Sequence, residues 1–143
     1  MTVKLYAESS AVLAWLLGEP SGKAVREVLA GASLVLASEL TLVECERALL
    51  RATATRGLAE AAAADRRARL ASAATHWGML KLGDEILARA RLPFPREPVR
   101  TLDALHLSTA LTARAALPGL ALLSLDERVR SNATALGFEV LPE

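Results

Sequence analysis

At 143 residues the chain fits a single domain, residues 1–143, that can bury a substantial core. A net charge of +1 gives no overall field of the kind that marks a nucleic-acid binder, and the lone Cys45 excludes an intrachain disulfide. The chain has no apolar run near the ~18 residues of a membrane span and no signal-peptide pattern, so we expect a cytoplasmic protein without a membrane partner.

Short apolar runs alternate with helical patterns along the whole chain. In chain order, the sequence predicts a strand at 3–7, helices at 9–17 and 22–29, a strand at 34–37, helices at 41–56 and 58–75, a strand at 77–82, a helix at 83–91, a helix from 101, a strand at 120–123, a helix at 124–136 and a strand at 138–141. Strands that alternate with helices imply βαβ units, so we predict an α/β fold with a mainly parallel sheet.

Four acidic side chains stand near points where predicted strands give way to helices: Glu8, Glu44, Asp103 and Asp126. The carboxyl ends of parallel strands share one crevice, so we expect the four to lie close together. Clustered carboxylates repel one another unless a cation joins them. Ligation by oxygen alone suits Mg²⁺ or Mn²⁺, and the sequence has no His/Cys cluster for zinc. The pattern favours metal-dependent hydrolysis of phosphodiester bonds.

Each acid also has an explanation that needs no ligand. Thr41-Leu42-Val43-Glu44 matches a capping box, in which Glu44 accepts from a free backbone amide. Ser124-Leu125-Asp126-Glu127 offers the same pattern, and a helix dipole would stabilise Asp126 and Asp103 in first turns. Taken singly, these explanations are the stronger ones. Four acids at one edge of a sheet nevertheless favour a shared cation.

Ten arginines crowd the middle of the chain, and two roles stay open for them: a solvated helix surface or contact with RNA phosphates. Acidic residues balance them over the chain as a whole, so the net charge does not decide between the two roles. They are Arg47, Arg51, Arg56, Arg66, Arg67, Arg69, Arg89, Arg91, Arg96 and Arg100.

Four short motifs follow one another along the chain. They are Tyr6-Ala7-Glu8-Ser9-Ser10-Ala11 with Leu17-Gly18-Glu19-Pro20, Thr41-Leu42-Val43-Glu44, Leu102-Asp103-Ala104-Leu105-His106-Leu107, and Leu123-Ser124-Leu125-Asp126 leading to Asn132, Ala133 and Leu136-Gly137-Phe138. In this order and spacing the chain resembles the PIN domain, and more closely the VapC-type ribonuclease toxins of bacterial toxin–antitoxin pairs. The resemblance implies a three-layer α/β/α PIN-like fold with a central sheet of four to five strands.

The resemblance also implies a set of site residues. The catalytic, metal-binding acids would be Glu8, Glu44, Asp103 and Asp126, and the supporting polar side chains Ser9 (or Ser10), Ser124 and Asn132. The family usually has Asp at the position of Glu8, and the extra methylene lengthens the reach of the carboxylate by roughly 1.5 Å. His106, three residues after Asp103, is a candidate general base, but a structural role is favoured because metal chemistry makes a base redundant.

The implied function is that of a toxin. An endoribonuclease with Mg²⁺ (or Mn²⁺) would hydrolyse RNA, either tRNA or rRNA, and leave a 3′-hydroxyl and a 5′-phosphate. A small antitoxin protein would hold it inactive, and the toxin would form a homodimer. The main alternative is a non-catalytic PIN-like module that binds RNA or protein. A receiver-like or phosphatase-like domain is weaker, because Glu8 stands where its phosphoacceptor Asp is needed and Lys81 is the only lysine beyond Lys23.

Overall fold

The computed structural model describes residues 2–143 and places them in seven helices and five strands. In chain order these are β1 (Val3–Ala7), α1 (Ser9–Leu16), α2 (Gly22–Gly31), β2 (Ala32–Ser38), α3 (Glu39–Thr55), α4 (Glu60–Ala74), β3 (Gly78–Leu80), α5 (Asp84–Ala90), α6 (Thr101–Ala116), β4 (Ala121–Leu123), α7 (Glu127–Ala135) and β5 (Val140–Leu141). The predicted order of strands and helices is confirmed.

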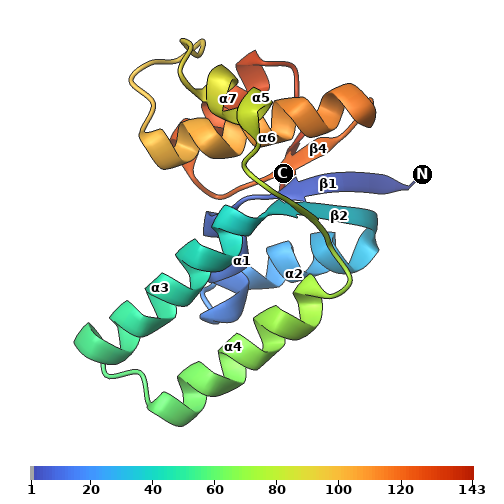
Figure 1. Cartoon of the computed structure of the whole chain (residues 1–143). Coiled ribbons are helices and arrows are strands. Elements are labelled where there is room, and N and C mark those ends of the chain that lie inside the picture. Colours follow the sequence, from blue (N-terminus) through green and yellow to red (C-terminus); the bar gives the residue numbers. More distant parts are fainter. Residues whose placement is uncertain (1) are drawn as a thin grey trace.

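The five strands of the described chain form one parallel sheet in the order β3-β2-β1-β4-β5, with β1 at its centre. Parallel neighbours need crossover connections, and helices supply these on both faces. Helices α5, α6 and α7 cover one face, and α1 to α4 lie on the other (Figure 1). The predicted three-layer α/β/α fold with a mainly parallel sheet is therefore confirmed.

The central strand β1 shows how the sequence produces two cores. Successive side chains of a strand point to opposite faces, so Leu5 and Ala7 face one layer of helices and Tyr6 faces the other. All three are fully buried. The core beneath α6 and α7 contains Tyr6, Leu107 and Leu122, whereas the core beneath α1 contains Leu5 and Ala7. The buried part of β1 is therefore an unbroken run from Leu5 to Ala7, and the exposed Lys4 lies before it.

Helix α3 begins earlier than the sequence predicts. Ser38 is its N-cap, and its hydroxyl oxygen accepts from the backbone N–H of Leu40 at 3.1 Å. Glu44 consequently lies in the second turn of α3, not in the first. The explanation of Glu44 as half of a capping box with Thr41 is therefore wrong.

Acidic residues, and not the neighbouring serines, cap α1 and α7. Glu8 accepts from the backbone N–H of Ser10 at the start of α1. Asp126 caps α7, which begins at Glu127, three residues later than predicted. Serine and carboxylate side chains are both good N-caps, so a serine next to an acid leaves the sequence ambiguous. The capping box that the sequence predicts at Ser124 is wrong for this reason.

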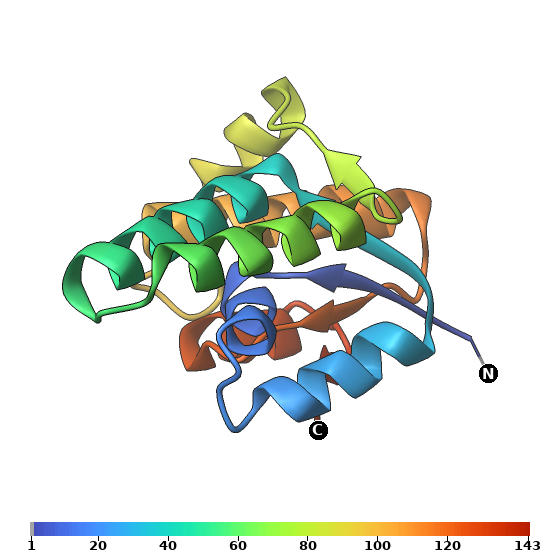
Figure 2. The same cartoon turned by 90° about the horizontal axis from the view of Figure 1, so that it is seen from below.

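Helices α3 and α4 form a hairpin that projects from the sheet, and they lie side by side in both views (Figures 1 and 2). Arg66 of α4 donates through Nε to the carbonyl of Leu16 at 2.9 Å, which ties the hairpin to the end of α1. Arg69 pairs with Asp65 on the same helix at 3.2 Å. These two arginines therefore have partners within the chain.

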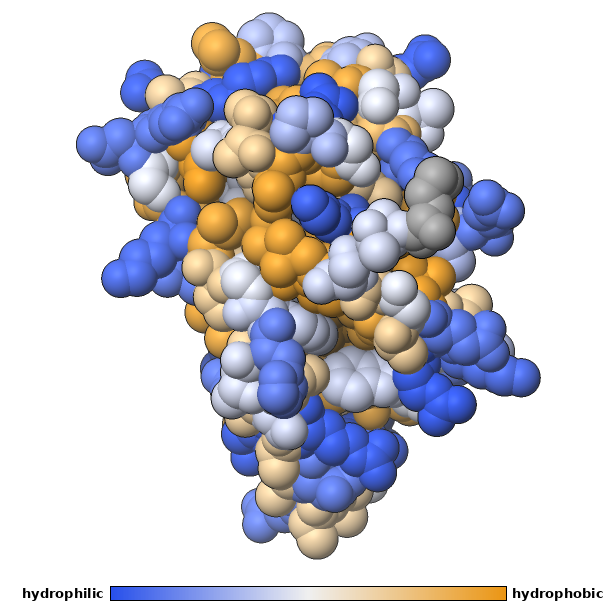
Figure 3. Space-filling view, turned by 90° about the vertical axis from the view of Figure 1, so that its right-hand side faces the viewer, coloured by the Kyte–Doolittle hydropathy of each residue, from blue (hydrophilic) through white to orange (hydrophobic). Residues whose placement is uncertain are grey.

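Figure 3 shows the face that carries the amino ends of the strands. Apolar side chains gather near the middle of this face, and hydrophilic side chains surround them. Within residues 2–143 there is no helix that combines the length and the hydropathy needed to cross a membrane.

The start of α2 packs so closely on α1 that it requires a glycine. A Cβ added to Gly22 would lie 2.4 Å from the carbonyl oxygen of Ala14. Gly22→Ala should therefore lower the free energy of unfolding, measured with urea, by roughly 1–3 kcal/mol. The matched control is Gly31→Ala in the same helix, where an added Cβ meets nothing within 4 Å and the change should be close to neutral. Equal stability of the two variants would contradict this close packing.

Candidate active site

The parallel topology brings the candidate residues toward the carboxyl edge of the sheet, to which the strand arrows of Figure 1 point. Glu8 follows β1 directly, and Ser124 follows the neighbouring strand β4. Glu44 lies in α3, which follows β2 on the other side of β1. Asp103 lies in the first turn of α6, and Asp126 caps α7. Five elements thus contribute to one edge.

The carboxylate of Glu8 is buried, with 4% of the residue exposed, and both of its oxygens accept hydrogen bonds. Oε1 accepts from the hydroxyls of Ser10 and Ser124, each at 2.6 Å, and Oε2 accepts from the backbone N–H of Ser10 at 2.7 Å. The hydroxyl oxygens of these serines accept from the backbone N–H groups of Leu125 and Asp126, at 2.9 and 3.1 Å. Glu8 therefore joins the start of α1 to the loop before α7.

Glu44 is held by a second network. Its Oε1 accepts from the hydroxyl of Ser9 at 2.7 Å and lies 2.5 Å from Nε2 of His106. Nδ1 of His106 lies 2.6 Å from the hydroxyl of Tyr6. Burial by itself would raise the pKa of Glu44, but the hydrogen bonds with His106 and Ser9, together with the nearby charges of His106 and Arg100, more than offset it, so the pKa is lowered. The network therefore favours the ionised carboxylate.

Asp103 and Asp126 share one positive charge. Arg100 donates through Nε to Oδ2 of Asp103 at 2.8 Å and through a terminal nitrogen to Oδ2 of Asp126 at 2.9 Å. Asp103, and then Asp126, raise the pKa of the guanidinium. The second oxygen of Asp126 accepts from the backbone N–H groups of Arg128 and Val129. Two carboxylates that are distant in sequence thus lie within reach of a single cation.

The donor set of this edge fits a hard divalent cation, because it consists of carboxylate oxygens. Glu44, Asp103 and Arg100 line one pocket of about 230 Å³. In residues 2–143, however, no three side chains of the His, Cys, Asp or Glu type are arranged as a ready metal site. The arrangement is a pair of carboxylates bridged by one arginine, with Glu44 beside it.

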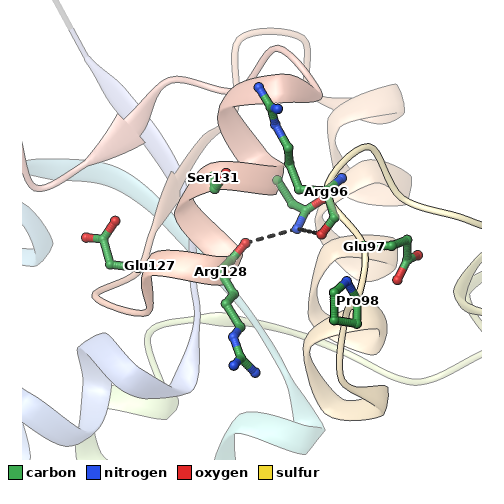
Figure 4. A pocket seen from close by; sticks show the side chains of 7 residues that line it. Arg96, Glu97, Pro98, Glu127, Arg128 and Ser131 are labelled. Carbon is green, nitrogen blue, oxygen red and sulfur yellow. Dashed lines mark hydrogen bonds between the residues drawn. The ribbon is translucent and has the colours of Figure 1, made fainter.

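Asn132 holds two chain segments together. Its Oδ1 accepts from the backbone N–H of Arg96 at 2.9 Å, and its Nδ2 donates to the carbonyls of Arg96 and Arg128 at 3.1 and 3.0 Å. Figure 4 shows Arg96 and Arg128 at the pocket that they line together. Asn132 is fully buried, and within the described chain all of these side-chain bonds go to backbone atoms. Asn132 therefore positions the loop that leads to Arg100 against α7, at a pocket of about 410 Å³.

Two residues of these networks, Arg100 and Tyr6, were not predicted from the sequence as part of the site. Arg100 was placed among the arginines of undecided role, although its spacing of three residues from Asp103 at a helix start predicts that ion pair. Nothing in the sequence around Arg100 predicts its contact with Asp126, because the two residues are 26 positions apart. Tyr6 lies 100 residues from His106 in the chain, and the sequence alone gives no reason to pair them.

A family model described as "PIN domain" matches residues 5–135 of the chain. Ribonuclease VapC46 of Mycobacterium tuberculosis is 33% identical over 139 residues, which are 96% of this chain and 95% of that protein. Ribonuclease VapC35 of the same organism is 36% identical over 58 residues. That second match covers 41% of this chain. It spans 43% of the length of VapC35, which is less than half of that protein.

Solved structures share the fold. A crystal structure of VapC20 from Mycobacterium tuberculosis, described as a sarcin–ricin loop cleaving toxin, superposes with a TM-score of 0.66 and 18% identity, over 97% of this chain and all of that one. A toxin–antitoxin complex from Klebsiella pneumoniae gives 0.64 and 15%, with 97% of each chain covered. Identities this low support the arrangement of helices and strands, and not a particular reaction.

Proposed function

Because the chain belongs to the PIN-domain family, we propose that it is a metal-dependent endoribonuclease and the toxin of a toxin–antitoxin pair. The proposed unit is one PIN-like domain over residues 1–143. The nearly full-length match to a VapC ribonuclease supports the activity. The structural observation that carries the proposal is the convergence of Asp103 and Asp126 on one cationic group at the carboxyl edge of the sheet.

We assign Mg²⁺ or Mn²⁺ to the edge where the four acids Glu8, Glu44, Asp103 and Asp126 gather, with Glu8 as a positioning residue and not as a ligand. When bound, such a cation lowers the pKa of a water molecule and stabilises charge on the leaving oxygen of a phosphate. Asp103 and Asp126 would hold it, with the oxygens that now face Arg100. Glu44 would bring a third carboxylate from the same pocket. Glu8 would act through the serines that it orients, because its oxygens are already engaged.

The proposed substrate is an RNA, either tRNA or rRNA, and the proposed partner is a small antitoxin protein. Support comes from the sarcin–ricin loop named for VapC20 and from the Klebsiella complex. Exposed arginines at the edge, Arg96, Arg100 and Arg128, suit RNA phosphates. We also propose a homodimer. A purified chain that stays monomeric and gains no stability from the product of its neighbouring gene would contradict both protein partners.

The direct test of the activity is cleavage of total tRNA and rRNA by the purified, folded protein with Mg²⁺ or Mn²⁺. Discrete fragments with 5′-phosphate ends are expected, and they should disappear with EDTA and in Asp103→Asn. Cleavage that persists in EDTA would contradict the metal, and absence of cleavage with either metal would contradict the activity.

The second candidate is a non-catalytic module that binds RNA or protein through this fold. The observation in its favour is that the carboxylates of the described chain are engaged by Arg100 and serines, and form no ready metal site. It predicts no cleavage with any metal, and RNA binding that is unchanged in Asp103→Asn. Electrophoretic mobility shifts on the same RNA preparations measure that binding.

Arg100→Ala should raise the affinity for Mn²⁺, because the metal would no longer have to displace a guanidinium from Asp103 and Asp126. Exposed ion pairs contribute little each, so an increase of about three- to tenfold is expected. The metal-free protein should also unfold more easily, since the two carboxylates then repel each other. Isothermal titration calorimetry measures the affinity. Arg96→Ala is the control, because its backbone and not its side chain binds Asn132. Weaker Mn²⁺ binding in Arg100→Ala would refute the competition.

A further inference from the structure

We propose that Tyr6 and His106 are positioning residues that hold the Glu44 carboxylate in its reactive orientation. The inference rests on the proposed function, because it gives a role at the same site to two side chains outside the set of acids. His106 lies in α6, Tyr6 in β1 and Glu44 in α3. One chain of polar contacts therefore links the central strand to the carboxylate across three elements.

The hydrogen bonds of this chain of contacts can be assigned donors and acceptors from Tyr6 through His106 to Glu44. The hydroxyl of Tyr6 is fully buried, and its oxygen lies 2.6 Å from Nδ1 of His106. We assign the hydroxyl as the donor of this contact and Nδ1 as its acceptor. The other ring nitrogen, Nε2, then carries the N–H that faces Oε1 of Glu44. A carboxylate only accepts, so this arrangement satisfies the contacts of the ring with Tyr6 and with Glu44.

Tyr6 and His106 are buried, which argues that they orient Glu44 and do not exchange protons with a substrate. Tyr6 is 0% exposed and His106 is 1% exposed, whereas Glu44 keeps about a quarter of its side chain accessible. Ser9 donates to the same oxygen of Glu44 and lies 3.0 Å from Nε2 of His106. Two groups thus fix Oε1 of Glu44 from the buried side. The second oxygen, Oε2, has no such partner in the described chain and is left for a ligand.

Partners of this kind matter because they fix the orientation of a metal-binding group. Removal of an outer hydrogen-bond partner typically costs 10–100-fold in metal affinity or activity. A purely structural histidine would instead affect stability and leave the metal affinity of the folded protein unchanged. The two roles are therefore distinguishable.

The test uses two amide substitutions of equal chemistry and different reach. His106→Gln places an N–H donor near the position of Nε2, whereas His106→Asn places it near Nδ1, where it faces Tyr6 and not Glu44. We expect His106→Asn to lower Mn²⁺ affinity and kcat for RNA by about 10–100-fold with little change in KM. His106→Gln should restore most of both, and Tyr6→Phe should fall between them.

Crystal structures of the two variants provide a readout that needs no activity. In His106→Asn the Glu44 carboxylate should leave the position it has beside Ser9, and in His106→Gln it should stay. Equal metal affinities of the folded Asn and Gln variants, or an unmoved Glu44 in His106→Asn, would overturn the proposal. A wild-type protein that binds no Mn²⁺ would instead refute the proposed metal site, and the position of Glu44 would still decide the role of His106.

Discussion

Asp126→Asn is expected to retain the fold and to lose RNA cleavage by about 100-fold or more. Asn caps helices as well as Asp does, so α7 should still begin at Glu127 in the variant. What the substitution removes is one of the two charges that converge on Arg100. A bound metal contributes several kcal/mol to stabilising the charge of the transition state, and each 1.36 kcal/mol is a factor of ten in rate.

Initial rates with saturating Mg²⁺ measure this loss, and the circular dichroism spectrum checks the fold. Asp84→Asn is a suitable control, because it removes a carboxylate from the first turn of α5, away from the four acids. The control should cleave like the wild type. Asp126→Asn that cleaves at the wild-type rate would show that this residue is a helix cap and nothing more.

Glu8→Gln is expected to lower the free energy of unfolding by about 1–3 kcal/mol, even without metal. The buried carboxylate accepts three hydrogen bonds, two on Oε1 and one on Oε2. An amide has only one accepting oxygen, so its NH₂ group must face at least one donor in a buried place. An unsatisfied buried group costs about this amount. The variant should also loosen the loop before α7, since Ser10 and Ser124 bind the backbone of that loop.

Urea unfolding of the metal-free protein at neutral pH gives the free energy. Glu46→Gln, on the exposed side of α3, is the control and should change stability little. If the loss in Glu8→Gln were no larger than in the control, Glu8 would not be the anchor that its contacts indicate. Glu8→Asp, which has the side chain usual in the family, should lose part of the network because the shorter carboxylate cannot reach all three donors.

The order of the helices and strands was predictable because short apolar runs alternate with segments whose apolar residues recur with the spacing of a helix. The gathering of Glu8, Glu44, Asp103 and Asp126 toward one edge follows from parallel topology alone. Hydrogen-bond partners were not predictable in the same way. Whether Glu8 or Ser10 caps α1 depends on which side chain can also reach Ser124, more than a hundred residues away.

The site contacts that the sequence does not predict are those between residues far apart in the chain. The pairing of Arg100 with Asp103 is local and follows from a spacing of three residues, but its second bond to Asp126 depends on how α7 packs beside α6. His106 was expected to be structural, on the argument that metal chemistry needs no base. Its contacts with Tyr6 and Glu44 agree with a role other than that of a base, and we propose that the buried histidine orients the carboxylate.

The measurement that tests the central claim most directly follows bound Mn²⁺ and RNA cleavage in the same samples. EDTA-treated protein is dialysed free of chelator and titrated with Mn²⁺, with bound metal measured by electron paramagnetic resonance and cleavage on gels. Metal binding and cleavage should rise over the same range of Mn²⁺ concentration, and Asp103→Asn should lose both. Full cleavage before any Mn²⁺ is bound, or wild-type binding and cleavage in Asp103→Asn, would contradict the account.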